Sequence, residues 1–301
     1  MTFPDSPGTL AAQPKERRAM TESGTVSQTV SDTAAPASRH VRLETGPERQ
    51  GAVAHLVLDR PEKRNALSLE MWQAIPPLVA QAVADPAVKA IVVRGVDRTA
   101  FAAGADISQF DERFRSRDTA LTYMNAVGAA AGALADCPKP AIALIHGDCV
   151  GGGVELAIAC DLRFCSSASR FGITPARLGI CYSMASTRRV AQAIGPSKTK
   201  DLLFSGRLID AETARAWGLA DRVYAPDDLD RETAAFLEAV CRNSQYSIRF
   251  AKRALREIAA GAVEEPETLR DLRLGAREAG DLEEGIAAYL EKRRPVFGWN
   301  G

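Results

Sequence analysis

Residues 141–163 constrain the fold of this 301-residue chain more than any other stretch. The apolar run 141–145 predicts a buried strand, and the apolar run 154–160 predicts a buried helix. The triplet Gly151-Gly152-Gly153 stands between them. Because glycine has no β-carbon, amides at this junction can approach a ligand closely, at the helix end that favours negative charge. The stretch therefore predicts an anion-stabilising backbone where a strand passes into a helix.

Glu155 lies about one turn into the predicted helix. A carboxylate beside amides that hold a polarised carbonyl indicates proton-transfer chemistry. The alternative is that the glycines only allow close packing of the helix, and that the helix dipole favours a carboxylate in its first turn. This segment alone leaves both interpretations open. Apolar neighbours should raise the pKa of Glu155 and the helix start should lower it, and the sequence does not decide between these two effects.

A second glycine segment, residues 100–107, directly follows a predicted strand at 89–95. Small residues around Gly104 expose backbone amides at the strand end. Two such loops can point two N–H groups at one oxygen, and losing one donor of such an oxyanion hole costs about 3 kcal/mol in the barrier. Asp106 fits a cap of the following turn better than a catalytic role.

Predicted strands and helices alternate through the first two thirds of the chain, which indicates an α/β core of stacked strand-strand-helix units. Ser68 is the predicted N-cap of a helix that ends at Ala84, and Pro76-Pro77 predicts a kink or a break in it. The expected strands lie at 53–59, 89–95, 141–145 and 161–166, and the expected helices at 69–84, 118–137 and 154–160.

Beyond residue 195 the pattern is that of helices, expected at 198–204, 211–217, 230–242, 248–260, 267–279 and 282–293. We therefore divide the chain into a disordered segment at 1–38, rich in Ser, Thr, Ala, Pro and Gly, an α/β core at 39–225 that holds the site, and a helical region at 226–301. Amphipathic helices in such a region often serve oligomerisation.

Charge and composition exclude several classes of protein. With 38 basic and 38 acidic residues, the net charge is zero, so no overall field draws the chain to nucleic acid or to an anionic membrane. No apolar stretch approaches the ~20 residues of a membrane span. The six cysteines form no C-x-x-C pair, which is typical of buried free thiols in a reducing cytoplasm.

Other catalytic classes lack their motifs. None of the three histidines stands in a zinc or Ser-His-Asp pattern, so no metal is expected. An early G-x-G-x-x-G with an acidic residue about 20 positions on is absent, as is a G-x-S-x-G elbow, which argues against a dinucleotide-binding enzyme and a serine hydrolase.

From about residue 41 to 298 the sequence resembles the crotonase (enoyl-CoA hydratase/isomerase) superfamily. Each motif is weak alone, but together they follow the order and spacing of that family. The matching stretches are 60–68, 101–107, 151–156, Phe171-Gly172 with Leu178-Gly179, 211–219, and 284–286 through 291–295.

The resemblance implies an α/β spiral of ββα units with a C-terminal helical oligomerisation region, assembled as a homotrimer or a dimer of trimers. It implies an acyl-CoA substrate and no separate cofactor, because CoA is part of the substrate. It assigns the oxyanion-hole amides to Ala105 and Gly152, and proton transfer to Glu155. The implied substrate-binding residues are Lys63, Arg64, Ala66, Ala103 at the adenine, Asp106, Ile107, Pro175, and Tyr289 and Lys292, which match positions that sometimes reach CoA from a neighbouring subunit.

One departure from the family concerns the second hydratase glutamate, whose position falls on Pro175. A prolyl side chain neither holds water nor gives a proton. A single carboxylate still suffices for a proton shuttle from C2 to C4, or for hydration in which Thr174, Tyr182 or Ser183 orients the water. Residues 174–182 also resemble methylmalonyl-CoA decarboxylases, in which the tyrosine is implicated near the departing carboxylate. The alternative for Tyr182 is a half-buried aromatic with a hydrogen-bonded hydroxyl.

Three functions follow from these residues. The first is an enoyl-CoA hydratase or isomerase that stabilises a thioester enolate with Glu155 as acid and base. The second is a decarboxylase of a methylmalonyl-type CoA that uses Tyr182 and Thr174. The third, less favoured, is RNA binding, known for some relatives with a lysine-rich helix; here the richest helix, 249–256, is typical of a solvated face.

Overall fold

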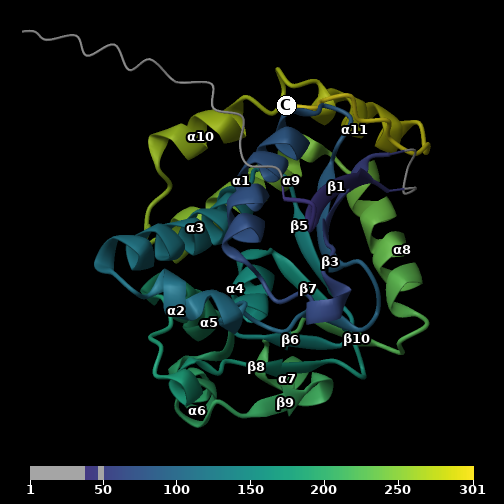
Figure 1. Ribbon diagram of the computed structural model, residues 1–301. Helices are drawn as coiled ribbons and strands as arrows, with labels where there is room; N and C mark the ends of the chain where they lie inside the picture. The colour runs from purple at the N-terminus through teal and green to yellow at the C-terminus, as the bar shows by residue number, and fades with distance from the viewer. Residues whose placement is uncertain (1–37, 47–50) are drawn as a thin grey trace, which may run out of the picture. The chain divides into compact units, whose positions relative to one another are not determined.

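The computed structural model describes residues 38–46 and 51–301 (Figure 1). The segment predicted to be disordered, 1–38, lies outside the described residues except for its last position. The larger of two sheets has six strands in the order β1-β2-β3-β5-β7-β10. Only β1 and β2 pair antiparallel, and the other neighbours are parallel. These strands are β1 (Val41–Thr45), β2 (Val53–Leu58), β3 (Ala90–Gly95), β5 (Ala141–Ile145), β7 (Leu162–Ser166) and β10 (Arg222–Tyr224).

The smaller sheet has four short strands in the order β4-β6-β8-β9. The first three pair in parallel, and β9 is antiparallel to β8. Its strands are β4 (Ala100–Ala102), β6 (Asp148–Val150), β8 (Arg170–Gly172) and β9 (Leu208–Asp210). Each has only three residues, too few to show a hydrophobic period, so the sequence did not predict them as strands.

The chain passes repeatedly from the larger sheet to the smaller one and then into a helix. Strands β3 and β4 precede α3 (Arg117–Asp136), β5 and β6 precede α4 (Gly152–Ala159), and β7 and β8 precede α5 (Met184–Ile194). This repetition confirms the predicted spiral of ββα units. It also brings the ends of β4, β6 and β8 side by side, so that the loops after them meet.

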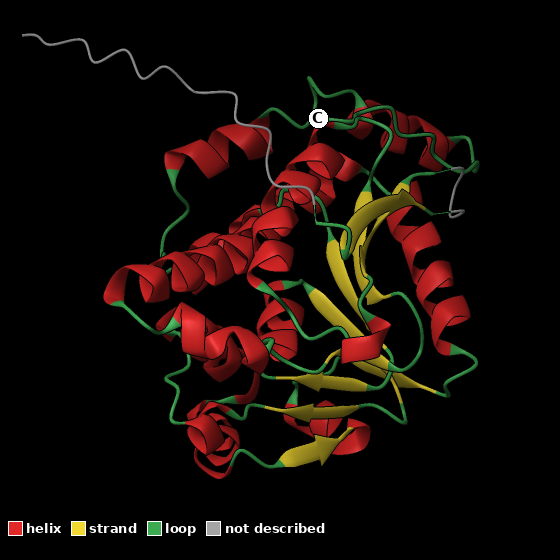
Figure 2. Ribbon diagram, in the orientation of Figure 1, coloured by secondary structure: helices red, strands yellow, loops and turns green. Residues whose placement is uncertain are grey.

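The larger sheet has helices on both faces, as Figures 1 and 2 show, and an apolar cluster lies on each face. Ile91 and Val93 of β3 belong to the layer that includes α1 (Leu69–Ala84) and α3. Ala90 and Val92 face the opposite way, toward α8 (Leu229–Arg242). Alternate burial of this kind is the two-residue period of a strand covered on both faces.

Helix α1 begins at its predicted cap, because the Ser68 side chain accepts a hydrogen bond from the Met71 amide. It continues without a break through Pro76 and Pro77. Each proline removes one backbone donor, but α1 packs along α3 with seven buried residues, and this packing holds the helix together.

The C-terminal helices lie close to their predicted positions. Helix α10 is the exception, since it ends five residues before the predicted 279 and Gly275 follows it. Helix α5 was not predicted.

No helix in the described ranges is long and apolar enough to cross a membrane. The remaining helices are α2 (Phe110–Arg113), α6 (Pro196–Ser205), α7 (Ala211–Trp217), α9 (Gln245–Ala259), α10 (Glu267–Leu274) and α11 (Asp281–Leu290).

Candidate active site

The three glycines between β6 and α4 are required for two different reasons. Gly151 has φ +52° and ψ −108°, a backbone conformation that L side chains rarely adopt. A β-carbon on Gly152 would lie 2.9 Å from Cζ2 of Trp72, and one on Gly153 would lie 2.4 Å from the carbonyl oxygen of Ala102. Close packing therefore explains Gly152 and Gly153, and the sharp turn into α4 explains Gly151.

The two glycine segments lie against each other. A β-carbon on Gly151 would be 3.8 Å from the Cα of Gly104 and 3.9 Å from Oγ1 of Thr174. Leu67 fixes the second segment, since its amide donates to the Gly104 carbonyl at 2.8 Å and its carbonyl accepts from the Asp106 amide at 2.9 Å. The fold thus brings together two loops that are 47 residues apart in sequence.

The amides of Ala105 and Gly152 are available to a ligand. Leu67 bonds the residues on either side of Ala105, so the N–H of Ala105 points away from that bridge. Gly152 is the first residue of α4, where an amide has no intrahelical partner. In the part of the chain that the structure describes, no group accepts a hydrogen bond from either amide.

Glu155 is buried one turn into α4, with 7% of its surface exposed. Its Oε1 accepts hydrogen bonds from the hydroxyls of Ser183, at 3.0 Å, and Ser186. Burial raises the pKa of Glu155 above its usual range, although these hydrogen bonds and the charge of Arg189 act in the opposite direction. The sequence left open whether the pKa of Glu155 is raised or lowered, and in the structure burial outweighs the opposing effects and raises it.

Tyr182 lies half-buried beside this carboxylate. Its hydroxyl donates to the carbonyl oxygen of Gly151 at 3.3 Å. Burial and the nearby charge of Glu155 raise the pKa of Tyr182 well above its ordinary value, so the hydroxyl keeps its proton at neutral pH. Pro175 begins the short 3₁₀ helix η4 (Pro175–Leu178) directly after Thr174. The structure thus brings Thr174 and Tyr182 to Gly151.

Asp106 caps the 3₁₀ helix η3 (Ile107–Gln109), as the sequence favoured. Its carboxylate accepts from the Ser108 amide and hydroxyl and pairs with Arg60 at 2.7 Å. Although burial pushes the pKa of Asp106 upward, these partners hold it below the ordinary value. Ile107 beside it is 49% exposed and accessible to a ligand.

The turn predicted to contact CoA lies next to the second glycine segment. The Ala103 amide donates to the Arg64 carbonyl at 3.0 Å, and Lys63 lies 3.8 Å from Asp106. Arg64, in the left-handed region at φ +52°, pairs with Asp148 at the start of β6. The structure therefore groups Lys63, Arg64, Ala66 and Ala103 beside Ala105.

Three aromatic rings pack together, and one of them, Tyr123, lies near Glu155. Phe110 and Phe114 pack edge to face with centroids 5.2 Å apart, and Tyr123 of α3 lies 5.8 Å from Phe110. Burial raises the pKa of Tyr123 to about 12, and the charge of Glu155 contributes to this rise. Tyr123 is thus close enough to Glu155 to sense its charge.

Tyr289 and Lys292 lie elsewhere in the chain. Tyr289 belongs to the last turn of α11 and Lys292 follows that helix, and Figure 1 shows α11 at the opposite end of the described unit from β6. Tyr289 is 84% exposed and lines a surface cavity of about 360 Å³ with Tyr246, Ile286 and Phe297. One chain alone does not bring these two residues to the glycine loops.

Comparison with known proteins identifies the family of this chain. A profile of the family described as Enoyl-CoA hydratase/isomerase matches residues 48–300. The chain belongs to the enoyl-CoA hydratase/isomerase family. A solved structure from Hyphomonas neptunium, provisionally classed in the same family, superposes with a TM-score of 0.83 at 40% identity, over 86% of this chain and 98% of that one.

Curated relatives agree with this assignment. A Thermus thermophilus protein that is provisionally named an enoyl-CoA hydratase is 36% identical over 82% of this chain and 98% of its own length. The crotonyl-CoA hydratase of Syntrophomonas wolfei is 31% identical over 83% of this chain and 96% of its own length. The family assignment therefore extends over almost the whole length of each relative.

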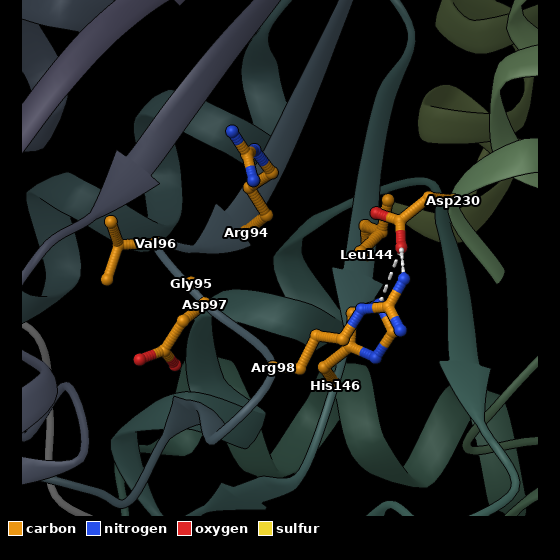
Figure 3. A pocket seen from close by; sticks show the side chains of 8 residues that line it. All are labelled: Arg94, Gly95, Val96, Asp97, Arg98, Leu144, His146 and Asp230. Carbon is orange, nitrogen blue, oxygen red and sulfur yellow. Dashed lines mark hydrogen bonds and ion pairs between the residues drawn. The ribbon is translucent and has the colours of Figure 1, made fainter. Parts of the chain in front are cut away.

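A second cavity of this family member, of about 290 Å³, lies at the carboxyl ends of β3 and β5 (Figure 3). Three of its side chains are linked, since Asp230 contacts His146 at 3.1 Å and Arg98 at 3.3 Å. It contains none of the predicted site residues. We interpret it as an ion-paired junction between the larger sheet and α8.

Sequence reasoning missed two residues that contact the predicted acid/base. Ser186 was not singled out, and Ser183 was considered only for orienting water. A pair of serines three residues apart is common at helix starts, so it is a possible signal for the cap of α5, but it carries no sign of the contact with Glu155.

Proposed function

We propose that this chain acts on an enoyl-CoA thioester and either adds water or moves its double bond. The observation that carries the proposal is the convergence of the two glycine segments, each with an unpartnered amide, next to a buried carboxylate. The amides of Ala105 and Gly152 would bind the thioester oxygen. They would stabilise negative charge there as a carbanion forms at C2.

Tyr182 strengthens one of these donors. The carbonyl of Gly151 and the N–H of Gly152 belong to the same peptide unit, and the Tyr182 hydroxyl donates to that carbonyl. A hydrogen bond at the carbonyl end of a peptide polarises the N–H at the other end. Tyr182 would thus fix and polarise the Gly152 amide, whereas the family resemblance alone gave it a role near a departing carboxylate.

Glu155 would transfer the proton. Its raised pKa brings the carboxyl closer to neutrality, where a group both accepts and returns a proton efficiently. Because Pro175 supplies no second carboxylate, the simplest reaction is isomerisation: Glu155 removes a proton from C2 of a 3-enoyl thioester and returns one to C4. For hydration, Thr174 would orient the water.

Binding of CoA would use Lys63, Arg64, Ala66, Ala103, Asp106 and Ile107, with Pro175 closing the acyl end. The exposed positions of Tyr289 and Lys292 support a contribution from a neighbouring subunit. We further propose a homotrimer or a dimer of trimers, supported by exposed apolar side chains on α9, α10 and α11, among them Leu255, Ile258, Leu274, Ile286 and Leu290. The reaction needs no cofactor besides the CoA of the substrate, and we place it in the cytoplasm.

A direct assay tests this proposal. The purified protein is incubated with crotonyl-CoA and with a 3-enoyl-CoA, and the enoyl absorbance is followed. Glu155→Gln should lower kcat by about 100-fold or more, the usual contribution of a positioned acid or base. Glu70→Gln, an exposed carboxylate in the first turn of α1, is the matched control and should keep wild-type activity. Full activity in Glu155→Gln would overturn the role of Glu155.

A methylmalonyl-type CoA decarboxylase is the second candidate, favoured by Tyr182 beside Glu155 and by Pro175 in place of a carboxylate. Release of CO₂ from methylmalonyl-CoA, without any change of crotonyl-CoA, would select it. RNA binding has less support, since Lys252 pairs with Asp161 and Arg256 with Asp136, which engages the cations of α9 within the fold. A filter-binding assay at physiological salt tests it.

A further inference from the structure

The two oxygens of the Glu155 carboxylate have different surroundings. Oε1 accepts both serine hydroxyls, at 3.0 Å from Ser183 and at a closer contact from Ser186. Among the described residues, no hydrogen bond to Oε2 is found. Since the residue is 7% exposed, this leaves one unpartnered carboxylate oxygen in a nearly buried residue. Such an arrangement fixes the carboxylate and leaves a single oxygen for a ligand.

Both serines belong to the start of α5. Ser183 is its N-cap, and Ser183 Oγ accepts a hydrogen bond from the Ser186 amide at 3.1 Å while its own proton goes to Glu155. A hydroxyl has one proton to donate and two lone pairs to accept with, so these contacts are compatible. The carboxylate therefore lies at the N-terminus of an 11-residue helix, where the dipole also favours its charged form.

We propose that Ser183 and Ser186 are positioning residues that hold Oε1 of Glu155, so that Oε2 is the only atom that exchanges a proton with the substrate or its water. This proposal rests on the proposed acid/base function of Glu155. The two hydroxyls also favour the charged carboxylate, because each hydrogen bond is stronger to the carboxylate than to the protonated acid. They thereby oppose the effect of burial on its pKa.

The described groups around Glu155 include Arg189 of α5 and two tyrosines. Burial raises the pKa of Tyr182 and Tyr123, so that both stay neutral near pH 7. Burial also raises the pKa of Cys149 on β6. Strands β4 and β5, which pack against α4, carry no ionisable side chain.

The remaining neighbour of α4 is β7, whose Arg163 is held by Asp221 and by the Leu219 carbonyl. Burial raises the pKa of Cys165, also on β7, to about 12. Asp148 of β6 is also ionisable and pairs with Arg64 and Arg170, so the titration of Glu155 is read from its own assigned carboxyl signal.

The test is the pKa of the Glu155 carboxyl, measured by ¹³C NMR with ¹³C-labelled glutamate and assigned by the signal lost in Glu155→Gln. In Ser186→Ala the pKa should rise by about one unit, a tenfold change in the protonation equilibrium. Ser183→Gly should act in the same direction, because glycine preserves most of the capping energy but removes the donor. Thr187→Ala, which removes a neighbouring hydroxyl of α5 with no contact to Glu155, should leave the pKa unchanged, as should Ser183→Thr, which keeps both the cap and the donor.

The titration needs no turnover, so it separates this proposal from the proposed function. An unchanged pKa in both Ser186→Ala and Ser183→Gly, in protein whose melting shows that it is folded, overturns the positioning role. A raised pKa supports it even if no CoA thioester is converted. In active protein, the acidic limb of the kcat profile should move to higher pH by the same amount as the titration, and a profile that stays in place would contradict the role of Oε2.

Discussion

At the scale of the residue, the burial proposed to suit Glu155 for proton transfer also has a cost in stability. Glu155 is buried in a position where its charged form costs free energy, and this cost raises its pKa. A group whose pKa is higher in the folded state than in the unfolded state contributes stability below the unfolded value. That contribution is lost as pH rises through the folded value.

Glu155→Gln should therefore be more stable than the wild type at neutral pH. The glutamine oxygen can still accept from Ser183 and Ser186, while no charge is buried. Chemical denaturation at pH 4 and at pH 7.5 measures this: the stability advantage of the variant should be larger at pH 7.5. An advantage that shrinks as pH rises would contradict the raised pKa of Glu155.

Tyr182→Phe tests whether the Tyr182 hydroxyl polarises the peptide between Gly151 and Gly152. Loss of one hydrogen bond to the Gly151 carbonyl, worth about 1 kcal/mol, should lower kcat by about fivefold with little change in KM. Stopped-time assays with the enoyl-CoA substrate measure both constants. An unchanged kcat would contradict the proposed role of Tyr182 in polarising the Gly152 amide. If the wild type releases CO₂ from methylmalonyl-CoA and the variant does not, the decarboxylase is supported instead.

At the scale of the element, the start of α4 is fixed by backbone contacts. The β-carbon of an alanine at 153 would meet the Ala102 carbonyl, which belongs to β4 and cannot rotate away. Gly153→Ala should therefore lower stability by about 1–3 kcal/mol. Gly128→Ala, at an exposed position of α3 with nothing within 4 Å, should raise it by up to about 1 kcal/mol. Equal melting temperatures for the two variants would show that a β-carbon at position 153 does not clash with the Ala102 carbonyl of β4.

The length and the environment of an element decide whether the sequence predicts it. The runs 53–58, 90–95 and 141–145 are mostly apolar because both faces of the larger sheet are covered, so their burial is visible in the sequence. Helix α5 contains Arg188 and Arg189 among mostly small residues, and only three of its residues are buried. Its place is decided by contacts with α4 and α6, which a local pattern does not contain.

In the candidate site, too, some residues can be predicted from the sequence and others depend on the fold. Glycine is distinctive, so the junction at 151–153 and the loop around Gly104 were found from sequence, and the structure packs them together. Serine is common and occurs in many capping positions, so the contact of Ser186 with Glu155 depends on the fold. The assignment of the amides and of Glu155 to catalysis stays a prediction for experiment.

At the scale of the whole molecule, the C-terminal helices present apolar side chains that a single chain leaves uncovered. If they form the proposed interface, a charge placed there should dissociate the assembly. Ile286→Asp on α11, 53% exposed, should yield smaller particles in sedimentation velocity and a higher KM for the CoA thioester. Met124→Asp on α3, 56% exposed, is the matched control and should leave both unchanged. A monomeric wild type would contradict the proposed assembly.

The central claim is that the Ala105 and Gly152 amides meet on one thioester oxygen. A crystal structure with a bound, slowly reacting CoA thioester tests it most directly. We predict that the thioester oxygen lies about 3 Å from both nitrogens, with Glu155 Oε2 facing C2. A thioester oxygen bound away from either nitrogen, or an acyl group on the far side of α4 from Glu155, would contradict the account.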